Sequence, residues 1–267
     1  MDFMHSEILD RYNHFHNYIH KVGDFLISIH QKKNFEIHNK GKFDLVTEAD
    51  LGSEKMVIEE ILNHFPQDSI LGEESGEVKG NSDFRWIIDP LDGTTNYSHN
   101  LPLYGVSIGV EQISSSQIVI GLVLFPELKD LYHAVRGEGS FKNKDRITVS
   151  QTTELKNSLF TTGFPYDRGD KLDLLLSYYK NILIRSRGIR RTGAATLDLC
   201  WLAEGKFDGY YEIGLKPWDM AAAGLIAEEA GAKLTTMDGK LYSPYIPTII
   251  ASNGKIHDKI LAEINFQ

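Results

Sequence analysis

Apolar residues recur every three or four positions near the amino terminus, which is the spacing of one face of an α-helix. Between residues 8 and 29 they are Ile8, Tyr12, Phe15, Ile19, Val22, Leu26 and Ile29. A second stretch with this spacing contains Val57, Ile58, Ile61, Leu62 and Phe65. Pro66 follows it and cannot continue a helix. The pattern therefore predicts two amphipathic helices at the start of the chain.

The middle of the chain changes to short apolar runs and to alternation of apolar and polar residues, which are typical of β-strands. The segments with this character are residues 69–71, 86–88, 103–110, 118–125, 131–135 and 146–149. A proline and polar residues at 126–130 predict a hairpin turn. We expect several of these strands to pair in one sheet.

Strands and helices alternate from about residue 150. The predicted strands are 159–163, 188–191, 207–213, 232–236 and 248–251, and the predicted helices are 172–182, 194–203, 219–230 and 256–264. Gly205 and Gly231 each follow a helix, where glycine commonly ends one. Such alternation is typical of an α/β arrangement. We therefore expect an α+β half over residues 1–150 and an α/β half over residues 151–267.

The composition narrows the class of protein. The 267 residues are 42% hydrophobic and 24% charged, as in ordinary globular proteins. The formal charge is −9 and basic runs are short, so we expect no nucleic-acid partner. The single cysteine, Cys200, lies among apolar residues, which predicts a buried thiol in a reducing compartment. Because the first residues lack the pattern of a signal peptide and no apolar run could span a membrane, we expect a cytoplasmic protein.

The candidate chemistry begins where the strand 86–88 runs into acidic residues. Asp89 and Asp92 flank Pro90, which is expected to end the strand because it has no N–H to donate. Gly93 and Thr94 then supply the start of a helix, whose free N–H groups would face the same space as the carboxylates. This arrangement suits a divalent cation that bridges a phosphate and reverses the negative field locally. The alternative is a capped turn with two solvated aspartates.

Three other acids stand at similar positions. Asp50 and Asp219 each begin a predicted helix, where a simple capping role is the alternative. Glu73 follows the strand 69–71, where a solvated loop acid is the alternative. Small residues at 221–224 would let their helix lie close to a neighbouring element and carry Asp219 into an interior cleft. Trp218 is expected to anchor the core.

Other metal and nucleotide patterns are missing from the sequence. There is no Walker-type loop, zinc-ligand spacing or nucleophile elbow, and residues 137–139 are expected to form a turn. The histidines of the first helix do not share one face with a carboxylate at metal-ligand spacing, so we expect His14, His16, His20 and His30 to be solvated.

Four motifs in this order resemble the inositol monophosphatase family. They are Asp44-Leu-Val-Thr47-x-x-Asp50, Gly72-Glu-Glu-Ser75, Trp86-Ile-Ile-Asp-Pro-Leu-Asp-Gly-Thr-Thr-Asn96 and Pro217-Trp-Asp219, and the match covers nearly the whole chain. The resemblance implies a layered αβαβα sandwich of the inositol monophosphatase and fructose-1,6-bisphosphatase type. It also implies dependence on two or three magnesium ions, with manganese as a possible substitute. Inhibition by lithium and a homodimer are common in the family.

The resemblance also implies roles for single residues. Glu73, Asp89 and the carbonyl of Leu91 match the ligands of a first metal, and Asp89, Asp92 and Asp219 match those of a second. Thr94 and Asp50 match the threonine–aspartate pair that polarises the attacking water, which Glu73 is also expected to touch. The N–H groups of Gly93 and Thr94 would hold the phosphate. The reaction implied is direct in-line displacement without a phosphoenzyme.

The substrate is less closely defined by the resemblance. Glu212 and the loop that contains Ala195 match positions that bind a polyol, so the leading substrate is myo-inositol monophosphate. The alternative for Glu212 is a solvated acid at a strand end. Lys216 departs from a histidine of some inositol-specific members. The segment 163–168, which ends at Arg168, together with Arg185, Arg187, Arg190 and Arg191 supplies positive charge that would suit a second phosphate. Histidinol phosphate, fructose bisphosphate, an adenosine bisphosphate, NADP 2′-phosphate and a catalytically silent binding role remain alternatives.

Overall fold

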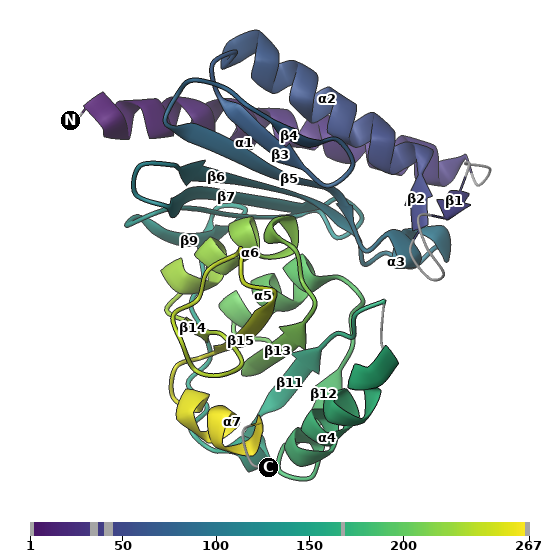
Figure 1. Cartoon of the computed structure of the whole chain (residues 1–267), viewed down its shortest axis with the longest axis vertical. Coiled ribbons are helices and arrows are strands. Elements are labelled where there is room, and N and C mark those ends of the chain that lie inside the picture. The colour runs from purple at the N-terminus through teal and green to yellow at the C-terminus, as the bar shows by residue number, and fades with distance from the viewer. Residues whose placement is uncertain (1–2, 33–36, 40–44, 167–168, 265–267) are drawn as a thin grey trace.

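The computed structural model arranges the chain in five layers, and it describes residues 3–32, 37–39, 45–166 and 169–264. Two helices lie on one sheet, two more separate it from a second sheet, and two others cover the far side (Figure 1). The helices are α1 (Phe3–Gln31), α2 (Glu48–His64), α3 (Thr94–Ser98), α4 (Leu172–Leu183), α5 (Ala195–Ala203), α6 (Pro217–Glu229) and α7 (His257–Ile264). The predicted αβαβα sandwich is therefore confirmed.

The first sheet has eight strands in the order β10-β9-β8-β7-β6-β5-β3-β4. They are β3 (Ser69–Gly72), β4 (Gly76–Val78), β5 (Phe84–Asp92), β6 (Gly105–Gln112), β7 (Gln117–Phe125), β8 (Asp130–Val135), β9 (Gly139–Lys142) and β10 (Asp145–Arg146). Neighbouring strands are antiparallel except β3 and β5, which run parallel. Because of this parallel pairing, Glu73 and the acids of β5 emerge at the same edge of the sheet.

The second sheet has five strands in the order β12-β11-β13-β15-β14. They are β11 (Leu159–Thr162), β12 (Gly188–Arg190), β13 (Gly209–Ile213), β14 (Lys233–Thr235) and β15 (Thr248–Ser252). The first three are parallel and the last two pairings are antiparallel. A short antiparallel pair, β1 (Ile37–Asn39) and β2 (Leu45–Thr47), precedes α2. Two single turns of 3-10 helix complete the elements, at Leu155–Asn157 and Gly169–Lys171.

Three apolar clusters hold the layers together. The predicted stripe of α1 is buried with α2 against one face of the first sheet, where Phe15 contacts Trp86 at 4.4 Å between ring centroids. A central cluster joins the other face of this sheet to α5 and α6, and it includes the buried Cys200. A third cluster lies between the second sheet, α4 and α7. Burial of each stripe is the main force that fixes its helix on a sheet.

Helix α6 packs unusually close to the first sheet because both partners are small. A Cβ added to Gly109 would lie 3.1 Å from the Cβ of Ala221, and one added to Gly121 would lie 2.5 Å from the carbonyl oxygen of Ala222. Glycine in the strands and alanine in the helix are therefore both required. This packing confirms the expectation that small residues bring α6 close enough to carry Asp219 inside.

Two predicted strand boundaries were wrong. Pro90 does not end β5, because a bulge between Asp89 and Asp92 lets the strand resume its pairing with β6 at Gly105. The predicted strand 146–149 is strand only at Arg146, although Ile147 and Val149 are buried. The Val149 N–H donates to the carbonyl of Ala230 at the end of α6 instead of a strand. The alternation of apolar residues thus predicted correctly which side chains are buried, but not whether these residues pair in a sheet. Strands β1, β2, β4 and β9 were not predicted.

The prediction of solvated histidines was wrong for most of α1. His20 is exposed, but His14, His16 and His30 are only partly exposed. Nε2 of His14 lies 2.7 Å from the carboxylate of Glu60, which comes from α2. Periodicity within one helix could not detect a carboxylate that a neighbouring helix contributes.

The two sheets divide near the predicted boundary, since β10 ends at Arg146 and β11 begins at Leu159. The central cluster crosses this division, because it contains Ile87 and Val123 as well as Leu199 and Ala222. The partition into halves 1–150 and 151–267 stays a prediction.

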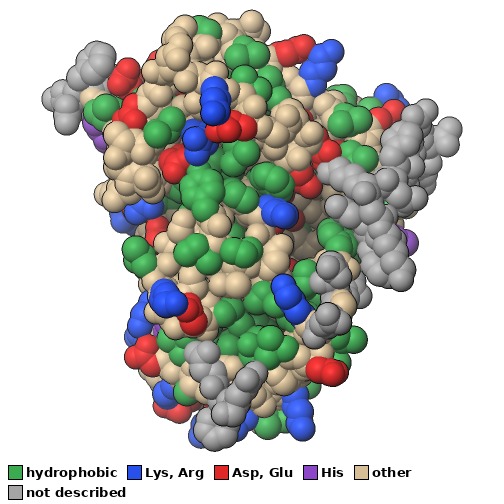
Figure 2. All heavy atoms as spheres, viewed as in Figure 1, with side chains coloured by type: hydrophobic (Ala, Val, Ile, Leu, Met, Phe, Trp, Pro, Cys, Tyr) green, Lys and Arg blue, Asp and Glu red, His purple; other side chains and the backbone are tan. Residues whose placement is uncertain are grey.

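In the described part of the chain no helix is long and apolar enough to cross a membrane. Basic side chains on the face in Figure 2 are scattered among acidic and apolar ones.

Candidate active site

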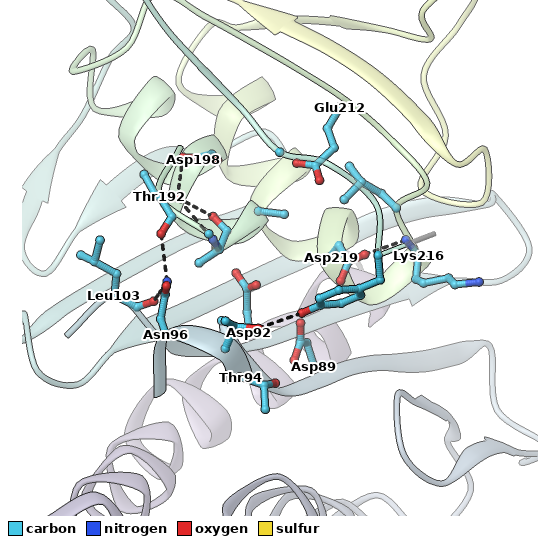
Figure 3. A pocket seen from close by; sticks show the side chains of 18 of the residues that line it. Asp89, Asp92, Thr94, Asn96, Leu103, Thr192, Asp198, Glu212, Lys216 and Asp219 are labelled. Atoms are coloured by element: carbon cyan, nitrogen blue, oxygen red, sulfur yellow. Dashed lines mark hydrogen bonds between the residues drawn. The ribbon is translucent and has the colours of Figure 1, made fainter. Parts of the chain in front are cut away.

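A pocket of about 750 Å³ brings together almost all of the predicted site residues. The predicted residues that line it are Glu73, Asp89, Leu91, Asp92, Gly93, Thr94, Ala195, Glu212 and Asp219. They come from the edge of the first sheet, from the starts of α3, α5 and α6, and from the end of β13. In Figure 3, Asp89, Asp92 and Asp219 point into one central space, and Glu212 faces it from the opposite side. Residues far apart in sequence therefore share one cavity.

The bulge of β5 is what presents two aspartates to the pocket. Asp89 still pairs with Ser107 and Asp92 with Gly105, so the residues between them leave the regular register. The Leu91 N–H donates to Oδ1 of Asp89 at 3.0 Å, and Ser53 Oγ donates to the Pro90 carbonyl at 2.9 Å. Hydrogen bonds from both sides thus hold the irregular backbone in place.

Gly93 is required at the turn that follows the bulge. Its φ of +87° lies in the left-handed region, and an added Cβ would lie 2.8 Å from the carbonyl oxygen of Leu103. Helix α3 then begins at Thr94 and lasts five residues. The predicted helix start is therefore present, although the helix is short.

Asp50 lies next to Thr94, and its two carboxylate oxygens have different hydrogen-bond partners. One oxygen accepts hydrogen bonds from the N–H and hydroxyl of Thr47, at 2.8 and 2.6 Å, which caps α2. The other lies 3.1 Å from the Thr94 hydroxyl, which is equally close to the Leu91 carbonyl. Burial raises the pKa of Asp50 to about 6, against the lowering effect of the Thr47 hydrogen bonds. The capping role and the pairing with Thr94 are therefore compatible.

The electrostatics of the pocket favour cations. Burial, followed by the negative charges of Glu73, Asp92 and Asp219, raises the pKa of Asp89 well above its usual value. Burial likewise raises the pKa of Asp219 well above its usual value. Unit charges about 4 Å apart repel by roughly 4 kcal/mol at an effective dielectric near 20. Oxygen donors in this number and charge fit magnesium or manganese.

Thr196 is a site residue that the sequence did not reveal. Its N–H donates to Oδ2 of Asp92 at 2.8 Å, and its hydroxyl makes a short hydrogen bond to the same oxygen. Burial raises the pKa of Asp92, and these two hydrogen bonds are the first effects that oppose it. A threonine near the start of a predicted helix suggests only capping, because Asp92 lies 104 residues away in sequence.

Glu212 lies on the wall opposite the aspartates. It accepts a hydrogen bond from the Tyr210 hydroxyl at 2.7 Å, and burial raises its pKa to about 7. A Cβ added to Gly163 would lie 2.2 Å from the Glu212 carboxylate, so a side chain there would displace this carboxylate. Glu212 does lie near the end of β13, but its side chain lines the pocket and is hydrogen-bonded to Tyr210, which argues against a freely solvated acid.

Of the arginines that were expected to supply positive charge, Arg168 lies outside the described residues, and among the other four only Arg191 lines the pocket. Its guanidinium lies 5.6 Å from the centre of the Phe164 ring, whereas Arg185 pairs with Glu263 at 2.7 Å elsewhere. Lys216 also lines the pocket, as does Trp218, which packs against the central core at the same time. Asp44 of the first motif lies outside the described residues.

Comparison with known proteins agrees with this geometry. A sequence model described as the inositol monophosphatase family matches residues 11–267. The chain is 39% identical over 249 residues to the phosphatase IMPL1, chloroplastic, of Arabidopsis thaliana, covering 91% of this chain and 67% of that protein. It is 41% identical over 223 residues to a putative Nus factor SuhB of Neisseria meningitidis, covering 83% and 85%.

Solved structures agree as well. The extragenic suppressor protein suhB of Bartonella henselae superposes with a TM-score of 0.91 at 35% identity, over 96% of this chain and 98% of that one. An IMPase/NADP phosphatase complexed with Mg²⁺ and phosphate superposes with a TM-score of 0.84 at 25% identity, over 98% and 97%. From its sequence, its layers and its pocket, the chain belongs to the inositol monophosphatase family of phosphatases.

Proposed function

We propose that this chain is a magnesium-dependent phosphomonoesterase that hydrolyses myo-inositol monophosphate to inositol and phosphate. The observation that carries the proposal is the meeting of Glu73, Asp89, Asp92 and Asp219 in one pocket. Buried carboxylates that repel one another are suited to hard cations, which prefer oxygen ligands. The relative complexed with Mg²⁺ and phosphate supports the same combination of cation and anion.

The proposed metal ligands fall into two overlapping sets. Glu73, Asp89 and the Leu91 carbonyl would hold a first ion, and Asp89, Asp92 and Asp219 would hold a second. When bound, such ions neutralise charge on phosphoryl oxygens and on the leaving oxygen, and they lower the pKa of a bound water. The Leu91 carbonyl can accept from Thr94 and still offer its second lone pair.

Thr94 and Asp50 would position the attacking water. A hydroxyl has one proton and two lone pairs, so when Thr94 donates to Asp50 its oxygen can accept a hydrogen bond from water in the pocket. Glu73 would accept the other proton of this water and turn its lone pair toward phosphorus. The N–H groups of Gly93 and Thr94 would donate to the phosphate and hold it in line.

The opposite wall would select the leaving group. The Glu212 carboxylate would accept hydrogen bonds from ring hydroxyls, and Ala195 at the start of α5 would line the space for the ring. Arg191 and Lys216 add two cations on this side of the pocket. They favour, as a second candidate, a small substrate with another anionic group, and the relative named an NADP phosphatase points the same way.

A substrate panel tests this assignment. Kinetic constants would be measured for inositol monophosphate, histidinol phosphate, fructose bisphosphate, an adenosine bisphosphate and NADP, with magnesium and with a chelator. We expect the highest kcat/KM for inositol monophosphate and no turnover in the chelator. If another substrate is hydrolysed much faster, the polyol assignment is wrong. If none is hydrolysed, the alternative of a silent binding member holds, which the name of the Neisseria relative also suggests.

The role of Thr94 has its own test. Thr94→Ala should lower kcat by about 10², since loss of one group that positions the reacting species costs this much in other enzymes. Thr94→Ser keeps the hydroxyl and should retain most of the activity. Equal activity in both variants would show that the hydroxyl is not used. A homodimer and lithium inhibition remain predictions from the family resemblance, and a cytoplasmic location remains a prediction from the sequence.

A further inference from the structure

A second cluster of possible metal ligands lies on the outer helical layer. It consists of His14 on α1 with Glu60 and His64 on α2, and one potential ligand atom from each lies within 4.8 Å of the others. None of the three lines the pocket of the proposed active site. The proposed phosphatase reaction does not use this cluster.

The cluster is held in place by the packing of the two helices. Glu60 and His64 are four residues apart and therefore share one face of α2. His14 lies among aromatic rings, with its ring centroid 5.8 Å from that of Phe65 and 6.4 Å from that of Tyr18. The side chains of His14 and Glu60 are 26% and 18% exposed, whereas that of His64 is 48% exposed. Nδ1 of His64 lies 3.1 Å from the backbone carbonyl oxygen of Glu60, so all three side chains have contacts that hold them near one another.

The distances are close to those of a bound ion. Nε2 of His14 lies 2.7 Å from Oε1 of Glu60, and Nδ1 of His64 lies 3.5 Å from the same oxygen. Ligand atoms about 2.0–2.2 Å from a common zinc ion lie at most about 4.3 Å apart. Both distances lie within this limit, and coordination through Nδ1 of His64 would replace its contact with the Glu60 carbonyl oxygen.

The donor set identifies the class of metal. Two imidazole nitrogens and one carboxylate are typical ligands of Zn²⁺ and related transition metals, with a fourth position left for water. Magnesium prefers oxygen ligands only, so it would not compete well here. The imidazole rings of His14 and His64 contact each other, with their centroids 4.0 Å apart, and Oε1 of Glu60 lies beside a nitrogen of each ring.

We propose that His14, Glu60 and His64 form a binding site for zinc or a similar transition-metal ion, which joins α1 to α2. The ion would stabilise the outer helical layer, because binding to the folded state alone shifts the unfolding equilibrium. The alternative is an ordinary hydrogen bond between His14 and Glu60 with His64 packed beside it. The two accounts differ in whether a metal is bound.

The test needs a protein in which the pocket cannot bind zinc. We would use the full chain with Asp89→Asn and Asp92→Asn, remove all metals, and titrate Zn²⁺ by calorimetry and Co²⁺ by its visible absorption. We expect one ion per chain, a Co²⁺ spectrum typical of nitrogen ligation, and a higher melting temperature with Zn²⁺. A large excess of Mg²⁺ should change none of these results.

Single substitutions in the same background assign the ligands. His14→Gln, Glu60→Gln and His64→Gln should each weaken Zn²⁺ binding at least about tenfold and abolish the rise in melting temperature. His20→Gln is the matched control, because His20 is an exposed histidine on the same helix, and it should bind like its parent. Circular dichroism of the metal-free variants would check that each is folded. Unchanged Zn²⁺ affinity in the three ligand variants, or no binding in the parent, would overturn the proposal.

Discussion

Buried carboxylates near the two ends of strand β5 have opposite electrostatic surroundings. Near its start, Asp68 accepts hydrogen bonds from Nε and Nη2 of Arg11, both at 2.8 Å, and from the indole N–H of Trp86 at 2.8 Å. Arg11 itself lies 3.9 Å from the centre of the Phe84 ring. At the other end, the charged groups that act on Asp89 are all negative. One end of the strand therefore lies beside an acid that is paired with a buried arginine, and the other end carries an acid that lies among further carboxylates.

This difference separates a structural ion pair from a candidate functional site. A buried charge is stable when it is paired and fully hydrogen-bonded, as Asp68 is. The pocket acids would need a cation from solution to reach the same state. Burial and negative charge alone are common to both ends of β5, so the source of the positive charge is what distinguishes them.

The largest effect is expected at the structural end. Arg11→Met would keep much of the side-chain volume but leave Asp68 buried without its cation. We expect a loss of about 3–5 kcal/mol in the free energy of unfolding, since this is the usual cost of breaking a buried pair by removing one partner. Urea denaturation would measure it. The activity per folded molecule should stay near the parental value, and a loss below about 1 kcal/mol would contradict this account of Asp68.

The next largest effect is expected at the pocket end of β5. Here we expect a loss of activity without a loss of stability. Asp92→Asn keeps an oxygen that can accept from Thr196 but removes one negative charge. We expect kcat to fall by about 10², equivalent to roughly 2.7 kcal/mol. Stability of the metal-free variant should be unchanged or higher, because repulsion within the cluster falls. A variant with normal turnover, or one that unfolds more readily without metal, would contradict the comparison.

The sequence predicted the pocket end of β5 well for a physical reason. An apolar strand followed at once by acids and glycine is a local pattern. Local patterns also marked Glu73 and Asp219, and the resemblance to known motifs then implied that these acids act together as metal ligands. Most helices were also predictable, because burial of one face produces a period that the sequence shows directly, as in α1. The structure places these residues in one pocket, whereas the motifs show only that they occur in the same chain in a given order.

Features that depend on two distant segments could not be predicted. The bulge at Pro90 depends on the register with β6, and the hydrogen bond from Thr196 to Asp92 depends on how α5 meets the first sheet. The contact between His14 and Glu60 depends on the packing of two helices. Each of these pairs is ordinary in its own segment, so the sequence carries no local sign of it.

A smaller effect is expected from substitution of Thr196, which donates hydrogen bonds to Asp92. Its hydroxyl and N–H both donate to Oδ2 of Asp92 and so fix the orientation of this carboxylate beside the pocket. Thr196→Val removes only the hydroxyl, so we expect about tenfold weaker magnesium binding, equivalent to roughly 1.4 kcal/mol. Calorimetry with Mg²⁺ would measure it. Thr196→Ser should bind like the parent, and equal affinities in both variants would mean that the hydroxyl does not orient Asp92.

The smallest effect is expected in the pH dependence of stability of the metal-free protein. Burial raises the pKa of Asp50 to about 6, whereas an unfolded aspartate titrates near 3.8. Between these values the folded state binds more protons, so its stability should rise as the pH falls from 7 to 5. Relative to Asp50→Asn, which cannot titrate, we expect a gain of about 1 kcal/mol over this range. Denaturation in a chelator at several pH values would measure it. If the free energy of unfolding changes equally with pH in the two proteins, the burial of the Asp50 charge must be compensated, as Arg11 compensates that of Asp68.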